Sequence, residues 1–302
     1  MRNMSRANSQ QWIDRRGHRI YEICKTLADF ADSLGRFEIR EIEDLTLDDW
    51  LVGLLPAWQK VSLVHRLAER FITEMFRKET GGPYISRTHI DPVSGTATFS
   101  RMLTVDFALN EYDIKIEPFD IPDPGPRVER RIGDRVVIEG GHTVADACYE
   151  YFTNDLIWSA EYAQLMDRMA DEVFHVLFAD RGVLAAVNAF VSSYIESGRL
   201  QDVYPDFSRL FTGSGRLRRK DIPQWVKRAV FHRERGYCAE CGHNLSWVLD
   251  SLARQHFDHV IPLAQGGLND ITNIQLLCER CNLAKASDLQ EPRLRYRRWL
   301  EP

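Results

Sequence analysis

Apolar side chains recur at steps of three and four residues through much of the first 78 residues. The series includes Ile20, Ile23, Cys24, Leu27 and Phe30. This spacing places the apolar side chains on one face of an α-helix, because the helix repeats every 3.6 residues. We therefore expect residues 10–78 to be mostly helical, with one buried face.

The pattern changes after the Thr-Gly-Gly-Pro turn at residues 80–83. Residues 96–109 and 113–119 are rich in β-branched and aromatic side chains, which is typical of strands. The sequence therefore predicts that a small sheet follows the first helices.

A second strand pair is indicated around Gly133 and Asp134. These residues separate two apolar stretches, 128–132 and 135–138, and Gly-Asp at this position is a signal for a two-residue hairpin turn. Helical spacing then returns over residues 143–197. The first two thirds of the chain therefore predict a helix-rich domain with a small antiparallel sheet.

The clearest boundary in the sequence is the Thr-Gly-Ser-Gly stretch at residues 212–215, which a basic run follows up to Lys220. Glycine and serine predict a flexible connection there. A short helix is expected after Pro223, with Gly236 at its end. The predicted organisation is a helix-rich domain over 1–212, a basic linker over 213–222, and a second domain over 223–302.

Composition agrees with two folded domains. The chain has 302 residues, of which 44% are hydrophobic, and a domain contains roughly 150 residues. No apolar run is long enough to span a membrane, and no signal-peptide pattern opens the sequence. We therefore expect a globular cytoplasmic protein of the α+β class, in which six cysteines are too few for a disulfide scaffold.

Charge is distributed unevenly along the chain. The net charge is -5, yet the segment from Arg216 onward carries 15 Lys and Arg against 10 Asp and Glu, which leaves 24 against 34 for the part before it. Such asymmetry indicates a nucleic-acid partner for the basic part. The average charge therefore does not exclude DNA binding.

Four of the cysteines form two Cys-x-x-Cys pairs, which are Cys238 with Cys241 and Cys278 with Cys281. Tetrahedral zinc is commonly held by four thiolates supplied by two such pairs. Disulfides or redox motifs are the alternative, and a reducing compartment disfavours both. The spacing predicts a zinc ion that is structural, because four protein ligands leave no open position.

Between and just after these pairs lie Asp258-His259, the Gly266-Gly267 turn, Asn273 and Asn282. In this order they resemble the His-Asn-His (HNH) endonuclease family in its zinc-stapled form, over about residues 227–287. The resemblance implies a ββα-metal (His-Me finger) fold, with two short antiparallel strands and a helix over about 281–288. It also implies a metal-dependent DNA endonuclease that leaves 5′-phosphate and 3′-hydroxyl ends.

The residue types suit hydrolysis of a phosphodiester. His259 can act as general base, because a neutral imidazole accepts a proton near neutral pH. Asp258 and Asn282 offer hard oxygen ligands for a catalytic Mg²⁺ or Mn²⁺. The resemblance implies that Asn273 holds the segment that carries the base. Lys285 lies on the helical face of Asn282 and is expected to contact a phosphate.

The end of the chain interleaves cations with aromatic side chains. Its candidate nucleic-acid contacts are Arg293, Arg295, Arg297 and Arg298, and such a stretch can follow phosphates and stack on bases. A solvated helix packed on the module is the alternative. Asn282 as a helix-start residue, Lys285 as a solvated charge, and surface roles for His256 and His243 also stay open.

Three functions remain in competition. The leading one is an HNH endonuclease acting on DNA, with a role in restriction or phage defence. The others are a non-catalytic zinc module that binds nucleic acid or protein, and a nickase subunit of a larger complex. Residues 1–212 show no comparable site, so we expect them to serve targeting, regulation, or assembly as a homodimer or with a partner protein.

Overall fold

The computed structural model describes residues 19–34, 52–90, 95–117, 119–122, 128–132, 135–139, 144–196, 205–246 and 256–285. The chain divides into two compact units. The first unit combines Met1–Tyr21 with Glu69–Asp171, and the second unit combines Glu22–Ala68 with Glu172–Pro302. The zinc and nuclease motifs therefore share a unit with segments from the amino-terminal half of the chain. The predicted boundary at 213–222 stays a prediction about which part folds alone.

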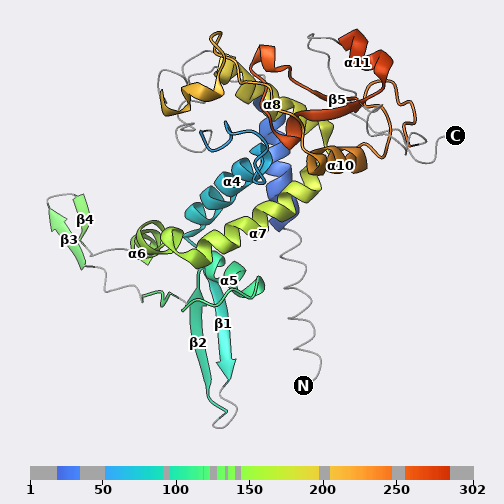
Figure 1. The fold of residues 1–302 in the computed structure, drawn as a ribbon. Helices are drawn as coiled ribbons and strands as arrows, with labels where there is room; N and C mark the ends of the chain where they lie inside the picture. The colour runs from blue at the N-terminus through green and yellow to red at the C-terminus, as the bar shows by residue number, and fades with distance from the viewer. Residues whose placement is uncertain are drawn as a thin grey trace. The chain divides into compact units, whose positions relative to one another are not determined.

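The first unit is built from helices and two separate hairpins (Figure 1). Its helical elements are residues 69–79 of α4 (Leu63–Glu79), α5 (Thr104–Glu111), α6 (Val144–Glu150), the π-helical turn η2 (Tyr151–Asp155), η3 (Leu156–Trp158) and residues 160–171 of α7 (Ala160–Leu177). Strands β1 (Ile85–Ile90) and β2 (Ala97–Met102) form one antiparallel pair, and β3 (Val128–Ile132) and β4 (Arg135–Glu139) form the other. The predicted hairpin around residues 133–134 is confirmed.

The strands expected over 96–109 and 113–119 are largely wrong. Only 97–102 is a strand, and α5 begins directly after Leu103, which has an extended backbone and precedes the first helical turn. The helix is buried from Val105 through Leu109, so its apolar residues show no amphipathic spacing. The partner strand of β2 lies upstream at 85–90, in a segment that the sequence pattern did not single out.

The second unit contains most of the chain's helices and the small sheet of the nuclease motif. Its elements are a helix over 22–33, the start of α4, the end of α7, α8 (Arg181–Glu196), η4 (Pro205–Leu210), α10 (Gln224–Arg233), β5 (His256–His259), η5 (Leu263–Gln265), η6 (Ile271–Asn273), β6 (Ile274–Leu277) and α11 (Glu279–Lys285). The predicted helix after Pro223 and the predicted strand, strand and helix order are confirmed. The fold class is α+β, as expected.

A single apolar core joins α10 to β6 and the zinc knuckles. It includes Val226, Val230, Leu245, Ile274 and Leu276, each at most 5% exposed. Strands β5 and β6 are antiparallel, with Asp258 opposite Gln275 and His259 opposite Ile274. This core fixes the strand that carries the Asp-His pair against the helix that precedes the first cysteine.

Helix α8 and the start of α4 hold the loop that connects β5 to β6. Asn188 of α8 donates from Nδ2 to Thr272 Oγ1 at 3.0 Å. The buried carboxylate of Asp270 accepts from the Leu63 backbone N–H at 3.2 Å and from the Thr272 backbone N–H at 2.8 Å. One side chain therefore caps η6 and α4 together, which satisfies N–H groups that helix starts leave without partners.

Residues 212–216 form a hydrogen-bonded turn, whereas the sequence predicts a flexible connection. The Thr212 N–H donates to the Arg216 carbonyl at 2.7 Å, and the Arg218 N–H donates to the Leu210 carbonyl at 2.8 Å. The Arg216 side chain donates to the Ala264 carbonyl at 2.8 Å. The basic run is therefore anchored beside the β5–β6 loop.

Among the described helices, no single one has the length and apolar content to cross a membrane. The pair α7 and α8 meets that test only when both are taken together, as a bent pair.

Candidate functional site

The four cysteines of the two Cys-x-x-Cys pairs come together. Their sulfur atoms all lie within 4.8 Å of one another, and Cys241 Sγ is 3.7 Å from Cys278 Sγ. Four sulfurs around a zinc ion at about 2.3 Å in a tetrahedron are separated by about 3.8 Å. The cluster of Cys238, Cys241, Cys278 and Cys281 therefore fits a structural zinc ion.

Backbone hydrogen bonds place the first pair against the second. The Gly242 N–H donates to the Cys238 carbonyl at 3.0 Å, which closes the knuckle, and the Ala239 N–H donates to the Leu276 carbonyl at 2.8 Å. Cys278 and Cys281 flank the start of α11. A zinc ion at the four sulfurs would therefore tie α11 to the segment that follows α10.

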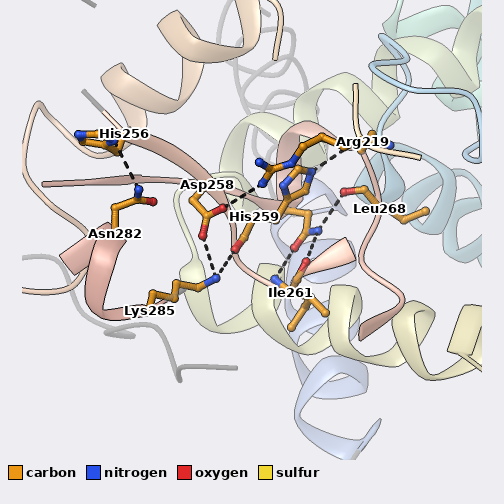
Figure 2. A network of polar contacts seen from close by, with 10 residues as sticks. Arg219, His256, Asp258, His259, Ile261, Leu268, Asn282 and Lys285 are labelled. Carbon is orange, nitrogen blue, oxygen red and sulfur yellow. Dashed lines mark hydrogen bonds and ion pairs between the residues drawn. The ribbon is translucent and has the colours of Figure 1, made fainter. Parts of the chain in front are cut away.

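Strand β5 ends on Asp258 and His259, and Lys285 of α11 binds both residues (Figure 2). Lys285 Nζ donates to Asp258 Oδ2 at 2.9 Å and to the His259 carbonyl at 2.8 Å. The Lys285 side chain is 1% exposed. Its observed role is to join α11 to the end of β5, and the expected contact with a phosphate stays a prediction.

Asn273 holds the chain that leaves β5. Its Oδ1 accepts from the Ile261 N–H at 2.8 Å, and its Nδ2 donates to the carbonyls of Ile261 at 3.0 Å and Leu268 at 2.9 Å. Gly267 passes so close that a Cβ atom there would lie 2.0 Å from the Ile261 oxygen. The geometry is that of a residue that orients the segment after His259, which is the role the resemblance implies for Asn273.

The imidazole of His259 is almost fully buried, at 2% exposure. Its Nε2 lies 3.3 Å from Asn269 Oδ1, while Nδ1 has no hydrogen-bond partner among the described residues. Burial lowers the pKa of His259 to about 4, and the negative charge of Asp258 opposes this shift. The ring is therefore neutral at pH 7, which is the form that can accept a proton.

A cavity of about 860 Å³ opens over this cluster. Asp258, His259 and Asn282 line one part of it, and Arg219, Lys220 and Lys227 line another. The Arg219 guanidinium lies 3.7 Å from Asp258 Oδ1, with its side chain 74% exposed. The cavity therefore combines oxygen ligands and a neutral imidazole with a cationic wall.

Asn282 and His256 meet at the edge of this cavity (Figure 2). Asn282 Nδ2 lies 3.4 Å from His256 Nδ1, so the amide nitrogen turns toward the histidine and Oδ1 stays available. Asn282 lies within α11, whose Asn282 N–H donates to the Cys278 carbonyl at 2.9 Å. His256 shares its strand face with Asp258 because side chains two residues apart point the same way.

Sequence reasoning missed several neighbours of His259. Asn269 contacts its imidazole, and the indole of Trp58 lies with its ring centroid 6.2 Å from the imidazole. Asn269 follows the Gly-Gly turn and offered that signal, whereas nothing near Trp58 in the sequence points to the site. Arg219 and Lys227 were seen only as a solvated run and a helix residue. The predicted contacts at residues 293–298 lie outside the described residues.

Comparison with known proteins agrees with the motif. Residues 238–288 match the family model of HNH endonucleases. Searches of curated proteins and of solved structures give no match. The second unit therefore contains an HNH domain with a cysteine cluster of the zinc-binding type, and such a domain suggests nuclease activity.

Proposed function

We propose that this protein is a metal-dependent DNA endonuclease that hydrolyses phosphodiester bonds. The observation that carries the proposal is the cavity that brings neutral His259 together with Asp258 and Asn282 beside a cationic wall. A non-catalytic zinc module has no need of a buried, neutral imidazole next to a carboxylate. The match of residues 238–288 to HNH endonucleases supports the same reaction class.

The cationic wall suits a polyanionic substrate. Arg219, Lys220 and Lys227 come from the segment before α10 and from α10 itself, and no acidic side chain of the cavity lining stands beside Lys227 in sequence. Most nucleic-acid affinity comes from neutralising phosphates with such cations. A phosphodiester held against this wall would lie across the cavity from Asp258.

The oxygen donors fit a divalent cation of the Mg²⁺ or Mn²⁺ type. Asp258 Oδ1 faces only Arg219, at a distance longer than a hydrogen bond, and Asn282 Oδ1 lies on the other side of its amide from His256. Two hard oxygens suit a small cation that keeps several waters. When bound, such an ion would offset charge that builds on the phosphate and the leaving oxygen.

The chain's own residues supply the remaining chemistry. His259 accepts the proton of a water molecule as that water attacks the phosphorus in line with the departing 3′ oxygen. Lys285 fixes Asp258 and the His259 backbone relative to α11, and Asn273 fixes the chain after His259. The products are a 5′-phosphate and a 3′-hydroxyl.

The test is cleavage of supercoiled plasmid by the zinc-loaded full chain, with Mg²⁺ or Mn²⁺ and with a chelator. His259→Ala is compared with His175→Ala, an exposed histidine of α7, and bound zinc is measured for each protein. We expect metal-dependent cutting that only His259→Ala abolishes. Equal cutting by both variants would refute the assignment of His259. DNA binding by the wild-type chain without cleavage under either metal would favour the binding module instead.

A further inference from the structure

The amide of Asn269 is held in one orientation. Its Nδ2 donates to the Arg218 carbonyl at 3.0 Å, and a carbonyl oxygen can only accept a hydrogen bond. A flipped amide would place Oδ1 against that carbonyl. The Asn269 Oδ1 must therefore face the His259 imidazole, whose Nε2 lies 3.3 Å away.

An amide oxygen that faces a neutral imidazole determines where the ring carries its proton. Oxygen accepts and cannot donate, so the facing nitrogen must carry the hydrogen. We infer that Asn269 holds His259 in the tautomer with hydrogen on Nε2, which leaves Nδ1 as the nitrogen that accepts the proton from water. This inference rests on the proposed function for the role of Nδ1, but the tautomer itself does not depend on it.

The position of Nδ1 agrees with this role. It has no hydrogen-bond partner among the described residues although the ring is buried. A buried imidazole nitrogen without a partner is costly unless it serves a substrate or a water molecule. His259 also belongs to the lining of the cavity that holds Asp258. Asn269 is therefore a positioning residue that acts through His259.

A segment some two hundred residues upstream holds Asn269 in place. The Trp58 N–H donates to the Asn269 carbonyl at 2.9 Å, and the indole packs against the His259 ring on the same side. Trp58 has a φ of 61°, a left-handed conformation that residues other than glycine adopt rarely and at a cost. Asp270, next in the chain, caps Leu63. The second unit therefore builds the surroundings of the base from both halves of the sequence.

Two substitutions separate an acceptor role from a structural one. Asn269→Asp keeps an oxygen toward His259 but places a second oxygen against the Arg218 carbonyl. Asn269→Leu has nearly the same size, removes the acceptor and presents only methyl groups to that carbonyl. A purely structural role predicts that Asp is the worse replacement, whereas a tautomer-setting role predicts that Leu is worse for catalysis.

The experiment uses the zinc-loaded full chain labelled with ¹⁵N-histidine, with the His259 signals assigned by their loss in His259→Gln. Long-range ¹H–¹⁵N spectra show which ring nitrogen carries the proton. We expect hydrogen on Nε2 in the wild type and in Asn269→Asp, and a loss of this preference in Asn269→Leu. With plasmid DNA, kcat of Asn269→Leu should fall about 10- to 100-fold at nearly constant KM, and Asn269→Asp should retain more of it.

Hydrogen on Nδ1 in the wild type, or an unchanged kcat in Asn269→Leu, would overturn the inference. Failure of the proposed function has a different signature, in which the spectra show the Nε2–H tautomer but His259→Ala cuts plasmid as fast as the wild type. The spectra require no cleavage, so the tautomer assignment is tested even in a protein that does not cut DNA.

Discussion

Replacing Asn273 should destabilise the second unit more than replacing any exposed asparagine. The side chain is 0% exposed and makes three hydrogen bonds to the backbone of Ile261 and Leu268. At about 1 kcal/mol each, their loss in Asn273→Ala costs about 3 kcal/mol. The backbone groups left buried without partners add to this cost. The total is a large fraction of the 5–15 kcal/mol by which a typical domain is stable.

The assay is equilibrium unfolding in urea with zinc held constant, and bound zinc is measured to show that each variant retains it. Asn110→Ala is the matched control, because Asn110 is exposed and donates one hydrogen bond, to the Asp106 carbonyl. We expect this control to change the unfolding free energy by less than about 0.5 kcal/mol.

Asn273→Asp distinguishes lost hydrogen bonds from lost volume. Aspartate has the same shape and can still accept from the Ile261 N–H, but it turns an oxygen toward the carbonyls of Ile261 and Leu268. We expect it to cost at least as much as Asn273→Ala. If Asn273→Ala unfolds at the same urea concentration as Asn110→Ala, or if Asn273→Asp is as stable as the wild type, the reasoning fails.

Three further outcomes follow from the same region. Gly267→Ala should cost about 1–3 kcal/mol by thermal unfolding, because its Cβ would lie 2.0 Å from the Ile261 oxygen, whereas Gly213→Ala, with nothing within 4 Å, should not. Chelation of zinc should lower the unfolding temperature, since zinc binding is coupled to folding, and added zinc should restore it. The pKa of His259 falls from 6.5 to about 4 on folding, so stability is complete above pH 6.5 and declines by about 3 kcal/mol toward pH 4; the His259→Gln unfolding curve should lack this decline.

The sequence was sufficient wherever a function depends on a few residue types at short spacing. The paired cysteines predict the sulfur cluster because two residues between cysteines allow one turn to aim both sulfurs at an ion. Pro223 and Gly236 mark the bounds of a helix for backbone reasons that act locally. Asn273 was identified by resemblance, and the structure supplies its three hydrogen bonds.

The sequence was insufficient where tertiary packing decides. Leu103, Val105, Phe107 and Leu109 alternate as in a strand, yet Val105 through Leu109 form a helix that is buried on all sides. Alternation carries no information about a helix without an exposed face. The basic residue Lys285 has the composition of a surface contact, but its position on α11 turns it into the core toward Asp258.

The composite second unit changes what the acidic amino-terminal half of the chain contributes. Arg181 of α8 forms a buried ion pair with Glu234, whose side chain is 1% exposed, and the Leu63 N–H binds Asp270. A fragment that begins at residue 213 would leave both acids without these partners, and an unpaired buried charge costs several kcal/mol. The amino-terminal segments therefore stabilise the fold around His259, in addition to any role in targeting or assembly.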